Sequence, residues 1–156
     1  MVLHPIEAGN FKLDGGGMFG VVPKTIWQRT NPADANNLID IAARCLLVED
    51  GDKLTLIDTG MGYKQSDQFF GYYSPWGSYN LKDSVKKAGF SMDEVTDVFL
   101  SHLHFDHVGG AVQWNKDRSA YEMAFKKDAF SLAFGFVAQS QCLVVVQKWA
   151  FLKAIS

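Results

Sequence analysis

The 156-residue sequence has few cysteines and no concentration of positive charge. Its two cysteines, Cys45 and Cys142, lie far apart, which argues against a disulfide scaffold or a cysteine-based zinc site. Fifteen Lys and Arg against seventeen Asp and Glu give a formal net charge of −2, and no run of basic residues is present. A nucleic-acid partner bound through a basic face is therefore not expected.

No targeting or membrane-spanning segment is expected either. The residues after Met1 contain neither the basic start nor the continuous apolar core of a signal peptide, so we expect a cytoplasmic protein. An uncharged stretch covers residues 129–147, but serine, glycine and glutamine interrupt it, whereas a membrane span needs about 20 predominantly apolar residues. We therefore expect no membrane partner.

Acidic residues are absent from the last part of the chain. All 17 lie at or before Asp128, and the only charged side chains after it are Lys148 and Lys153. Such an abrupt change in composition indicates a boundary. We expect residues 1–128 to form the amino-terminal part of one domain, and residues 129–156 to be a divergent, largely uncharged tail that completes or replaces the rest of it.

Histidine is also scarce, yet three of the four histidines lie within six positions, as His102, His104 and His107, with Asp106 among them. In extended backbone, residues i and i+2 project to the same side, so His102 and His104 can bind one cation together. Asp106 and His107 can bind a second cation where the chain turns. Imidazole and carboxylate are ligands that zinc, iron and manganese accept in hydrolytic sites. The alternative is a solvated polar loop, or a histidine paired in the core.

Hydrophobic runs predict an α/β fold around this motif. A run at residues 98–100 predicts a buried strand whose carboxyl end leads into the histidines. Further strands are predicted at residues 2–13, 38–48 and 53–57. An Asp-Gly pair between the last two predicts a hairpin. Strands followed by helices indicate part of a layered α/β sandwich.

The segments between these strands are predicted as a turn, a helix and loops. The glycines that follow Asp14 predict a turn. Asn80, with Asp83 three residues later, resembles a capping box and predicts a helix over residues 81–88. Loops are predicted over residues 24–37 and 61–79. The second loop is rich in aromatic side chains, which either cover an apolar substrate or pack against the sheet.

The motif His102-x-His104-x-Asp106-His107 resembles the signature of the metallo-β-lactamase fold superfamily. The segment LTLIDTG, at residues 54–60, is similar to the strand and turn that precede the signature in that family. The sequence is further similar to the subgroup that contains lactone hydrolases of quorum signals and organophosphate hydrolases. The resemblance implies an αββα sandwich, of which this chain would provide the amino-terminal half.

The resemblance also implies a site. His102 and His104 would bind one metal ion, and Asp106 and His107 a second, with zinc expected and manganese or iron as alternatives. Asp106 would also be the catalytic residue that accepts a proton from the nucleophile. Asp58 would orient a ligand histidine through a hydrogen bond, or would instead cap the turn after its strand. The implied function is hydrolysis of a small-molecule lactone, ester or organophosphate by a metal-bound hydroxide.

The later ligands of that family are missing from the sequence. The family pattern needs further histidines and a bridging aspartate downstream, but no histidine follows His107, and the later carboxylates are Asp117, Glu122 and Asp128. We therefore expect an impaired hydrolase whose tail arose by truncation or by a change of reading frame.

Two other functions stay open at this point. A non-catalytic metal-binding or interaction module would bind metal without turnover, and a thiolester hydrolase of the glyoxalase type would cleave a different bond. Because a halved sheet exposes strand edges, association into homo-oligomers is also expected.

Overall fold

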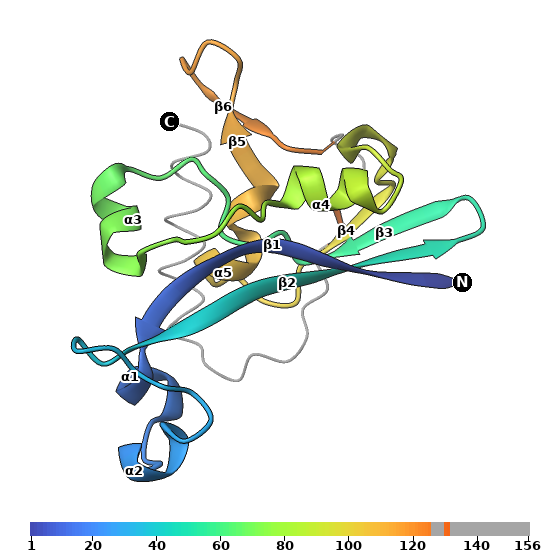
Figure 1. The fold of residues 1–156 in the computed structure, drawn as a ribbon. Coiled ribbons are helices and arrows are strands. Elements are labelled where there is room, and N and C mark those ends of the chain that lie inside the picture. The colour runs from blue at the N-terminus through green and yellow to red at the C-terminus, as the bar shows by residue number, and fades with distance from the viewer. Residues whose placement is uncertain (126–129, 132–156) are drawn as a thin grey trace.

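The computed structural model describes residues 1–125 and 130–131. Figure 1 shows a twisted sheet with short helices beside it, and a separate two-stranded sheet that projects from it. The larger sheet has five strands in the order β1-β2-β3-β4-β7, and the smaller one pairs β5 with β6. This mixture of helices and strands confirms the predicted α/β class.

Two long antiparallel strands form most of the sheet. β1 (Val2–Asp14) pairs with β2 (Leu38–Asp50) over its whole length, with one irregularity between Glu7 and Gly9. β2 then turns into the antiparallel β3 (Lys53–Ile57). The turn contains a glycine at position 51 with a φ of 60°, the left-handed conformation that an Asp-Gly hairpin requires. The three predicted strands and the hairpin are confirmed.

Parallel pairing begins at β4 (Asp97–Phe99), which lies between β3 and β7 (Phe130–Ser131). Val98 is fully buried at the centre of this short strand. The carboxyl ends of two parallel strands meet at the same edge of a sheet. The segment that leaves β3 and the segment that leaves β4 therefore emerge side by side, and the second of them carries the histidine motif.

The predicted capped helix is confirmed as α4 (Leu81–Lys87), which lies beside β1 in Figure 1. The side-chain oxygen of Asn80 accepts a hydrogen bond from the backbone N–H of Asp83 at 2.8 Å, which satisfies one of the free donors at the helix start. Leu81 and Val85 of this helix are buried against the sheet. The core therefore lies between α4 and one face of the sheet.

Apolar side chains from β1, β2, β3, β4 and α4 meet in that core. Alternate positions of the strands contribute to it, because successive side chains of a strand point to opposite faces. The buried members are Ile6, Ala8, Cys45, Leu47, Leu54, Leu56, Leu81, Val85, Val95, Val98, Leu100 and Phe125.

The glycines after Asp14 form a short helix, so the prediction of a turn is wrong. α1 (Gly15–Phe19) begins where the Asp14 carboxylate accepts a backbone N–H of the first turn at 2.7 Å. α2 (Lys24–Trp27) interrupts the predicted loop that follows. The buried Trp27 ring stacks on the ring of Phe19, with 5.0 Å between the centroids. Helices this short are not stable alone, so the tertiary contact stabilises them.

The second predicted loop is likewise interrupted, by α3 (Asp67–Tyr73). Its cap is Ser66, whose hydroxyl accepts the backbone N–H of Phe69 at 3.2 Å. The remaining elements are short and surround the histidine motif or lead from it. They are η1 (Met92–Glu94), α5 (Phe105–Val108), η2 (Gly109–Ala111), β5 (Val112–Trp114) and β6 (Tyr121–Met123).

The predicted tail over residues 129–156 is represented only by β7, and the rest of it lies outside the described residues. The boundary predicted at Asp128 also falls outside them. Among the helices that the structure describes, none has the length and apolar character that crossing a bilayer requires.

We expect Gly109→Ala to lower the free energy of unfolding by about 2 to 3 kcal/mol. A Cβ at this position would lie 1.9 Å from the backbone carbonyl oxygen of Met61, so one of the two backbones must move. Gly71→Ala is the matched control, because a Cβ there meets no atom within 4 Å and alanine is the better helix former. Urea unfolding of both variants checks this, and equal midpoints would contradict it.

Candidate metal centre

Two strand ends meet at the candidate site. Asp58 follows β3, and its backbone N–H donates to the carbonyl of Phe99, the last residue of β4, at 2.8 Å. The chain then continues from β4 through the buried Leu100 into Ser101 and His102. The parallel register of β3 and β4 therefore places Asp58 next to the start of the histidine motif.

The Asp58 carboxylate accepts three hydrogen bonds at this junction. Its Oδ1 accepts the backbone N–H of Ser101 at 2.8 Å, and its Oδ2 accepts the Ser101 hydroxyl at 2.7 Å. Oδ2 also accepts Nδ1–H of His107 at 2.8 Å. Asp58 has a φ of 60°, which shows that the backbone adopts a strained conformation to aim this side chain. Asp58 thus contacts a motif histidine directly, as well as Ser101 in the segment after β4.

The hydrogen bonds also assign the histidine tautomers. The Ser101 hydroxyl gives its single proton to Asp58, so its oxygen accepts Nδ1–H of His102 at 3.1 Å. His102 Nε2 then accepts Nδ1–H of His104 at 3.2 Å. His107 also has its proton on Nδ1, facing Asp58. His102 therefore has an unprotonated Nε2, the form of imidazole that binds metal ions, and the bonds place a proton on Nδ1 of each of the three rings.

The three rings and the Asp106 carboxylate lie in contact. The ring centroids of His102 and His107 are 3.9 Å apart, and those of His102 and His104 are 4.6 Å apart. The Nε2 atom of His107 faces Oδ2 of Asp106 at 3.6 Å. Burial lowers the pKa of His102, and the neighbouring His107 and His104 lower it further. His102 is therefore neutral at pH 7.

Aromatic side chains pack against the motif at Phe105. The Phe105 ring, between His104 and Asp106 in sequence, packs on Tyr73 with 4.5 Å between centroids and on Phe69 at 5.4 Å. It also meets the fully buried Phe11 of β1 at 6.3 Å. Phe69 and Tyr73 of the second predicted loop therefore pack against the motif, and Tyr73 also meets Phe11 of the sheet, whereas Tyr72 and Trp76 are exposed.

The backbone around the motif is fixed as well. The carbonyl of His107 accepts both the backbone N–H of Thr59 at 2.7 Å and its hydroxyl at 2.9 Å. Gly110 donates its backbone N–H to the carbonyl of Gly60 at 3.0 Å. These hydrogen bonds join the segment after β3 to the segment after β4 at several positions. The backbone that carries the histidines is therefore held rigidly.

All five residues predicted for the site are thus brought together: Asp58, His102, His104, Asp106 and His107. As the side chains stand, no set of three or more His, Cys, Asp or Glu residues within the described ranges is grouped so that it could hold a metal ion. The ligand and catalytic roles of these residues therefore stay predictions. The sequence reasoning missed Ser101, although its position directly before His102 at a strand end is a usable signal.

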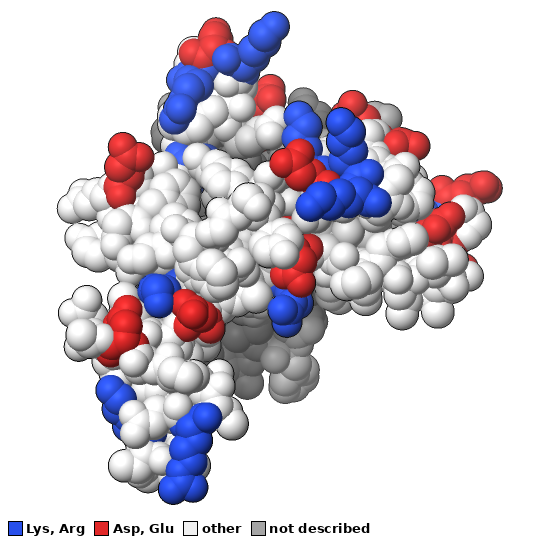
Figure 2. Space-filling model, viewed as in Figure 1, with Lys and Arg blue, Asp and Glu red and all other residues white. Residues whose placement is uncertain are grey.

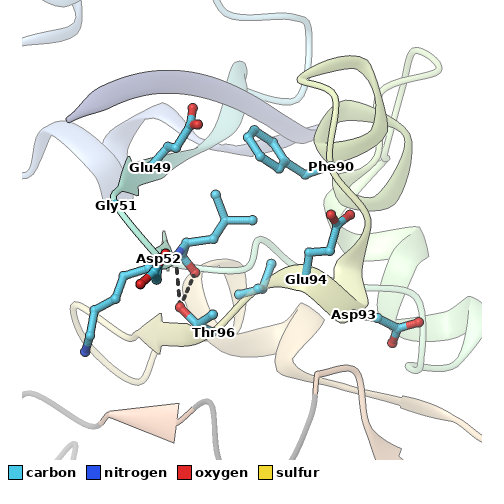
Figure 3. Close-up of a pocket in the computed structure, with 10 residues that line it drawn as sticks. Glu49, Gly51, Asp52, Phe90, Asp93, Glu94 and Thr96 are labelled. Atoms are coloured by element: carbon cyan, nitrogen blue, oxygen red, sulfur yellow. Dashed lines mark hydrogen bonds between the residues drawn. The ribbon is translucent and has the colours of Figure 1, made fainter.

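A cavity of about 550 Å³ lies elsewhere, at the opposite ends of β3 and β4 (Figure 3). Glu49, Phe90 and Glu94 stand around it, and the Thr96 hydroxyl pairs with the backbone of Leu54 at its floor. None of the predicted site residues lines it. A search for the functional site by cavity size alone would therefore not identify the histidine motif.

Comparison with known proteins decides the family. A family model for the metallo-beta-lactamase superfamily matches residues 40–140, which is more than half of the chain and includes the whole motif. The chain belongs to the metallo-beta-lactamase superfamily. The resemblance seen in the motif and in the segment at residues 54–60 is confirmed.

Lactonases are among the members of the superfamily that this chain resembles. N-acyl homoserine lactonase AiiB from Agrobacterium fabrum strain C58 is 28% identical over 145 residues, which are 87% of this chain and 50% of that protein. The structure of AidC, a dizinc quorum-quenching lactonase in complex with the product N-hexnoyl-L-homoserine, is 31% identical with a TM-score of 0.55. It is matched over 83% of this chain and 40% of that chain.

A probable metal-dependent hydrolase from Staphylococcus aureus has the same fold over a similar stretch. Its structure superposes with a TM-score of 0.68 at 28% identity, over 72% of this chain and 41% of that chain. The chain spans about half the length of the curated relatives that it matches. Its α/β fold therefore corresponds to part of the metallo-beta-lactamase fold.

We expect Ser101→Ala to lower the free energy of unfolding by about 1 to 2 kcal/mol, because Asp58 and His102 each lose a partner in a half-buried site. His102 should then populate its other tautomer more than it does in the unchanged protein, since only the hydrogen bond from His104 still keeps the proton on Nδ1. Nitrogen NMR of the imidazoles measures this directly. Ser119→Ala is the control, because its hydroxyl bonds Asp117 at the surface and its loss should cost less than about 0.5 kcal/mol. An unchanged His102 spectrum in Ser101→Ala would refute the tautomer assignment.

Proposed function

We propose that this chain contributes the metal-binding motif of a hydrolase that cleaves lactone or ester bonds in small molecules. The observation that carries the proposal is the convergence of three imidazoles and one carboxylate beside Asp58, with hydrogen bonds that place a proton on Nδ1 of each ring. The superfamily membership and the lactonase relatives support the reaction class.

The donor types suit a metal ion, although the described side chains as they stand do not form a group of three or more ligands. His107 gives its Nδ1–H to Asp58, and its Nε2 faces an oxygen of Asp106 at 3.6 Å, so this nitrogen and this oxygen could both turn to one cation. His102 and His104 would hold one ion, and Asp106 and His107 a second, with zinc favoured because AidC is a dizinc lactonase.

A bound metal ion would polarise the carbonyl oxygen of the substrate and lower the pKa of water nearby. The chain's own residues supply the orientation. Asp58 fixes the His107 ring directly and the His102 ring through Ser101, so the metal-facing nitrogens are set before any ion arrives. Asp106 is placed to accept a proton at its carboxylate. Phe105 holds the intervening backbone through its packing on Tyr73.

We further propose that the polypeptide alone is a poor catalyst. Residues 1–128 supply the first part of a metallo-beta-lactamase domain, and no histidine follows His107 in the sequence. The chain also spans about half the length of its curated relatives. A site with fewer protein ligands holds metal more weakly and positions substrate less well.

We expect the purified chain to bind zinc, and His104→Ala to weaken that binding by about tenfold or more. Competition against a coloured chelator gives the affinity. His4→Ala is the matched control, because His4 pairs at 3.1 Å with Glu49, which lines the cavity at the opposite ends of β3 and β4, and its loss should leave zinc affinity unchanged. If both variants weaken binding equally, or neither does, the motif is not the zinc site.

Turnover is tested separately with N-hexanoyl-L-homoserine lactone. We expect a kcat below about 0.1 s⁻¹ for the zinc-loaded chain, against roughly 10 s⁻¹ for a typical enzyme. Titration of the released carboxylic acid measures it. A kcat near the typical value that is lost in His104→Ala would contradict the proposal that this chain is a poor catalyst, and it would support the proposed reaction class. Zinc binding with no turnover on any lactone would favour the non-catalytic metal module instead.

A further inference from the structure

A second cavity, of about 330 Å³, lies on the other side of the segment that supports the motif. Its walls come from the segment after β3, the start of α4, β5 and the turn between β5 and β6. This volume is at the lower end of the range that holds small organic ligands. None of the three motif histidines lines it, so it is distinct from the candidate metal centre.

The charges around this cavity all have one sign. Lys64, Lys82 and Arg118 line it, and no carboxylate is among the lining residues, all of which the structure describes. In Figure 2, blue side chains stand over α4 and over the tip of β5 and β6, the elements that carry Lys82 and Arg118, with red side chains among them. None of these three cations forms an ion pair with another residue in the described part of the chain. The cavity is therefore an electropositive hollow without its own counter-ion.

Lys64 is the most unusual of the three. Its Nζ donates a hydrogen bond to the backbone carbonyl of Gly109, which is a neutral partner. Burial lowers the pKa of Lys64 to about 8, because no anion compensates for the water that the amine has lost. A half-buried cation without a counter-charge is costly unless something offsets it. An anion in the adjacent cavity would do so.

Trp114 gives the cavity a flat apolar wall that also fixes two of the cations. Its indole N–H donates to the backbone carbonyl of Lys64 at 3.0 Å, which joins β5 to the Lys64 segment. The guanidinium of Arg118 lies 5.8 Å from the centre of the Trp114 ring, and Tyr121 stacks on the ring at 4.1 Å between centroids. The wall and the charges are therefore held by contacts within the protein.

We propose that this cavity binds a small organic anion whose carboxylate or phosphate lies between Lys64 and Arg118 and whose apolar part packs against Trp114. A carboxylate or phosphate would supply the negative charge that Lys64, Lys82 and Arg118 lack. Two of its oxygens can also pair with the planar guanidinium of Arg118. The cavity of Figure 3 is predominantly acidic, since Glu49, Asp52, Asp93 and Glu94 line it beside one cation, Lys53, which is paired with Asp97. It therefore serves as an internal reference surface that should not respond to an anion.

The experiment is an NMR titration of the full chain, with no metal added, using phenyl phosphate, benzoate and inorganic phosphate as separate probes. We expect saturable shifts of the Trp114 indole N–H and the Lys64 amide with at least one organic anion, and no saturable shift at Phe90 or Val95 beside the reference cavity. The comparison of phenyl phosphate with benzoate distinguishes a phosphate site from a carboxylate site. Inorganic phosphate should bind more weakly than phenyl phosphate, because it makes no contact with Trp114.

Two variants and a control locate the site. Lys64→Met and Arg118→Met should each lower the affinity for the organic anion by about tenfold or more. Arg118 is exposed, so its variant retains the fold even if Lys64→Met does not. Lys116→Met removes an exposed cation of the same turn that does not line the cavity, and it should change affinity less than about twofold.

Three results would overturn the proposal. They are no saturable shift at Trp114 with any probe, equal shifts at Phe90 and Val95, and equal weakening by Lys116→Met and Arg118→Met. The last two would show attraction to surface charge rather than a site. Tighter binding of inorganic phosphate than of phenyl phosphate would contradict the role given to Trp114.

Discussion

The carboxylate of Asp58 is the interaction on which the rest of the candidate centre depends. It stands at the end of β3 and accepts hydrogen bonds from Ser101 and His107, which belong to the segment after β4. It therefore joins the two strand ends, and it determines a histidine proton directly at His107 and through Ser101 at His102. Without it, the imidazoles would keep their place in the sequence but not their tautomers, and those tautomers are what allows Nε2 to act as a ligand.

Two regions with different electrostatic character lie on either side of the same support. The histidine side brings three imidazoles and the carboxylates of Asp58 and Asp106 into contact, a set of donor types that suits a cation. The Lys64 side has ammonium and guanidinium groups without counter-charges, which favours an anion. Thr59 and Gly110 belong to both regions, because they line the Lys64 cavity and also hold the backbone of the motif. The superfamily fold thus brings together charge patterns that net charge alone does not reveal.

Local patterns sufficed for much of the fold. The long strands, the Gly51 hairpin and the helix capped by Asn80 were all predictable, because each is determined by residues close together in sequence. The helices α1, α2 and α3 were not predictable, since they depend on distant contacts such as Trp27 on Phe19. Ser101 was missed for the same reason, because its partner Asp58 lies 43 residues away and becomes a neighbour only through the parallel pairing.

That separation of 43 residues also bears on the order of folding. The hairpin of β2 and β3 closes a short loop and can form early, whereas the β3–β4 pair must close a long one before Asp58 reaches the histidines. A peptide that contains only the motif would therefore hold its imidazoles in many orientations. The histidines and Asp106 therefore reach their native arrangement late in folding. A metal ion that binds only this arrangement binds only the native state, so the amount of bound ion measures the fraction of chains in which β3 and β4 have paired.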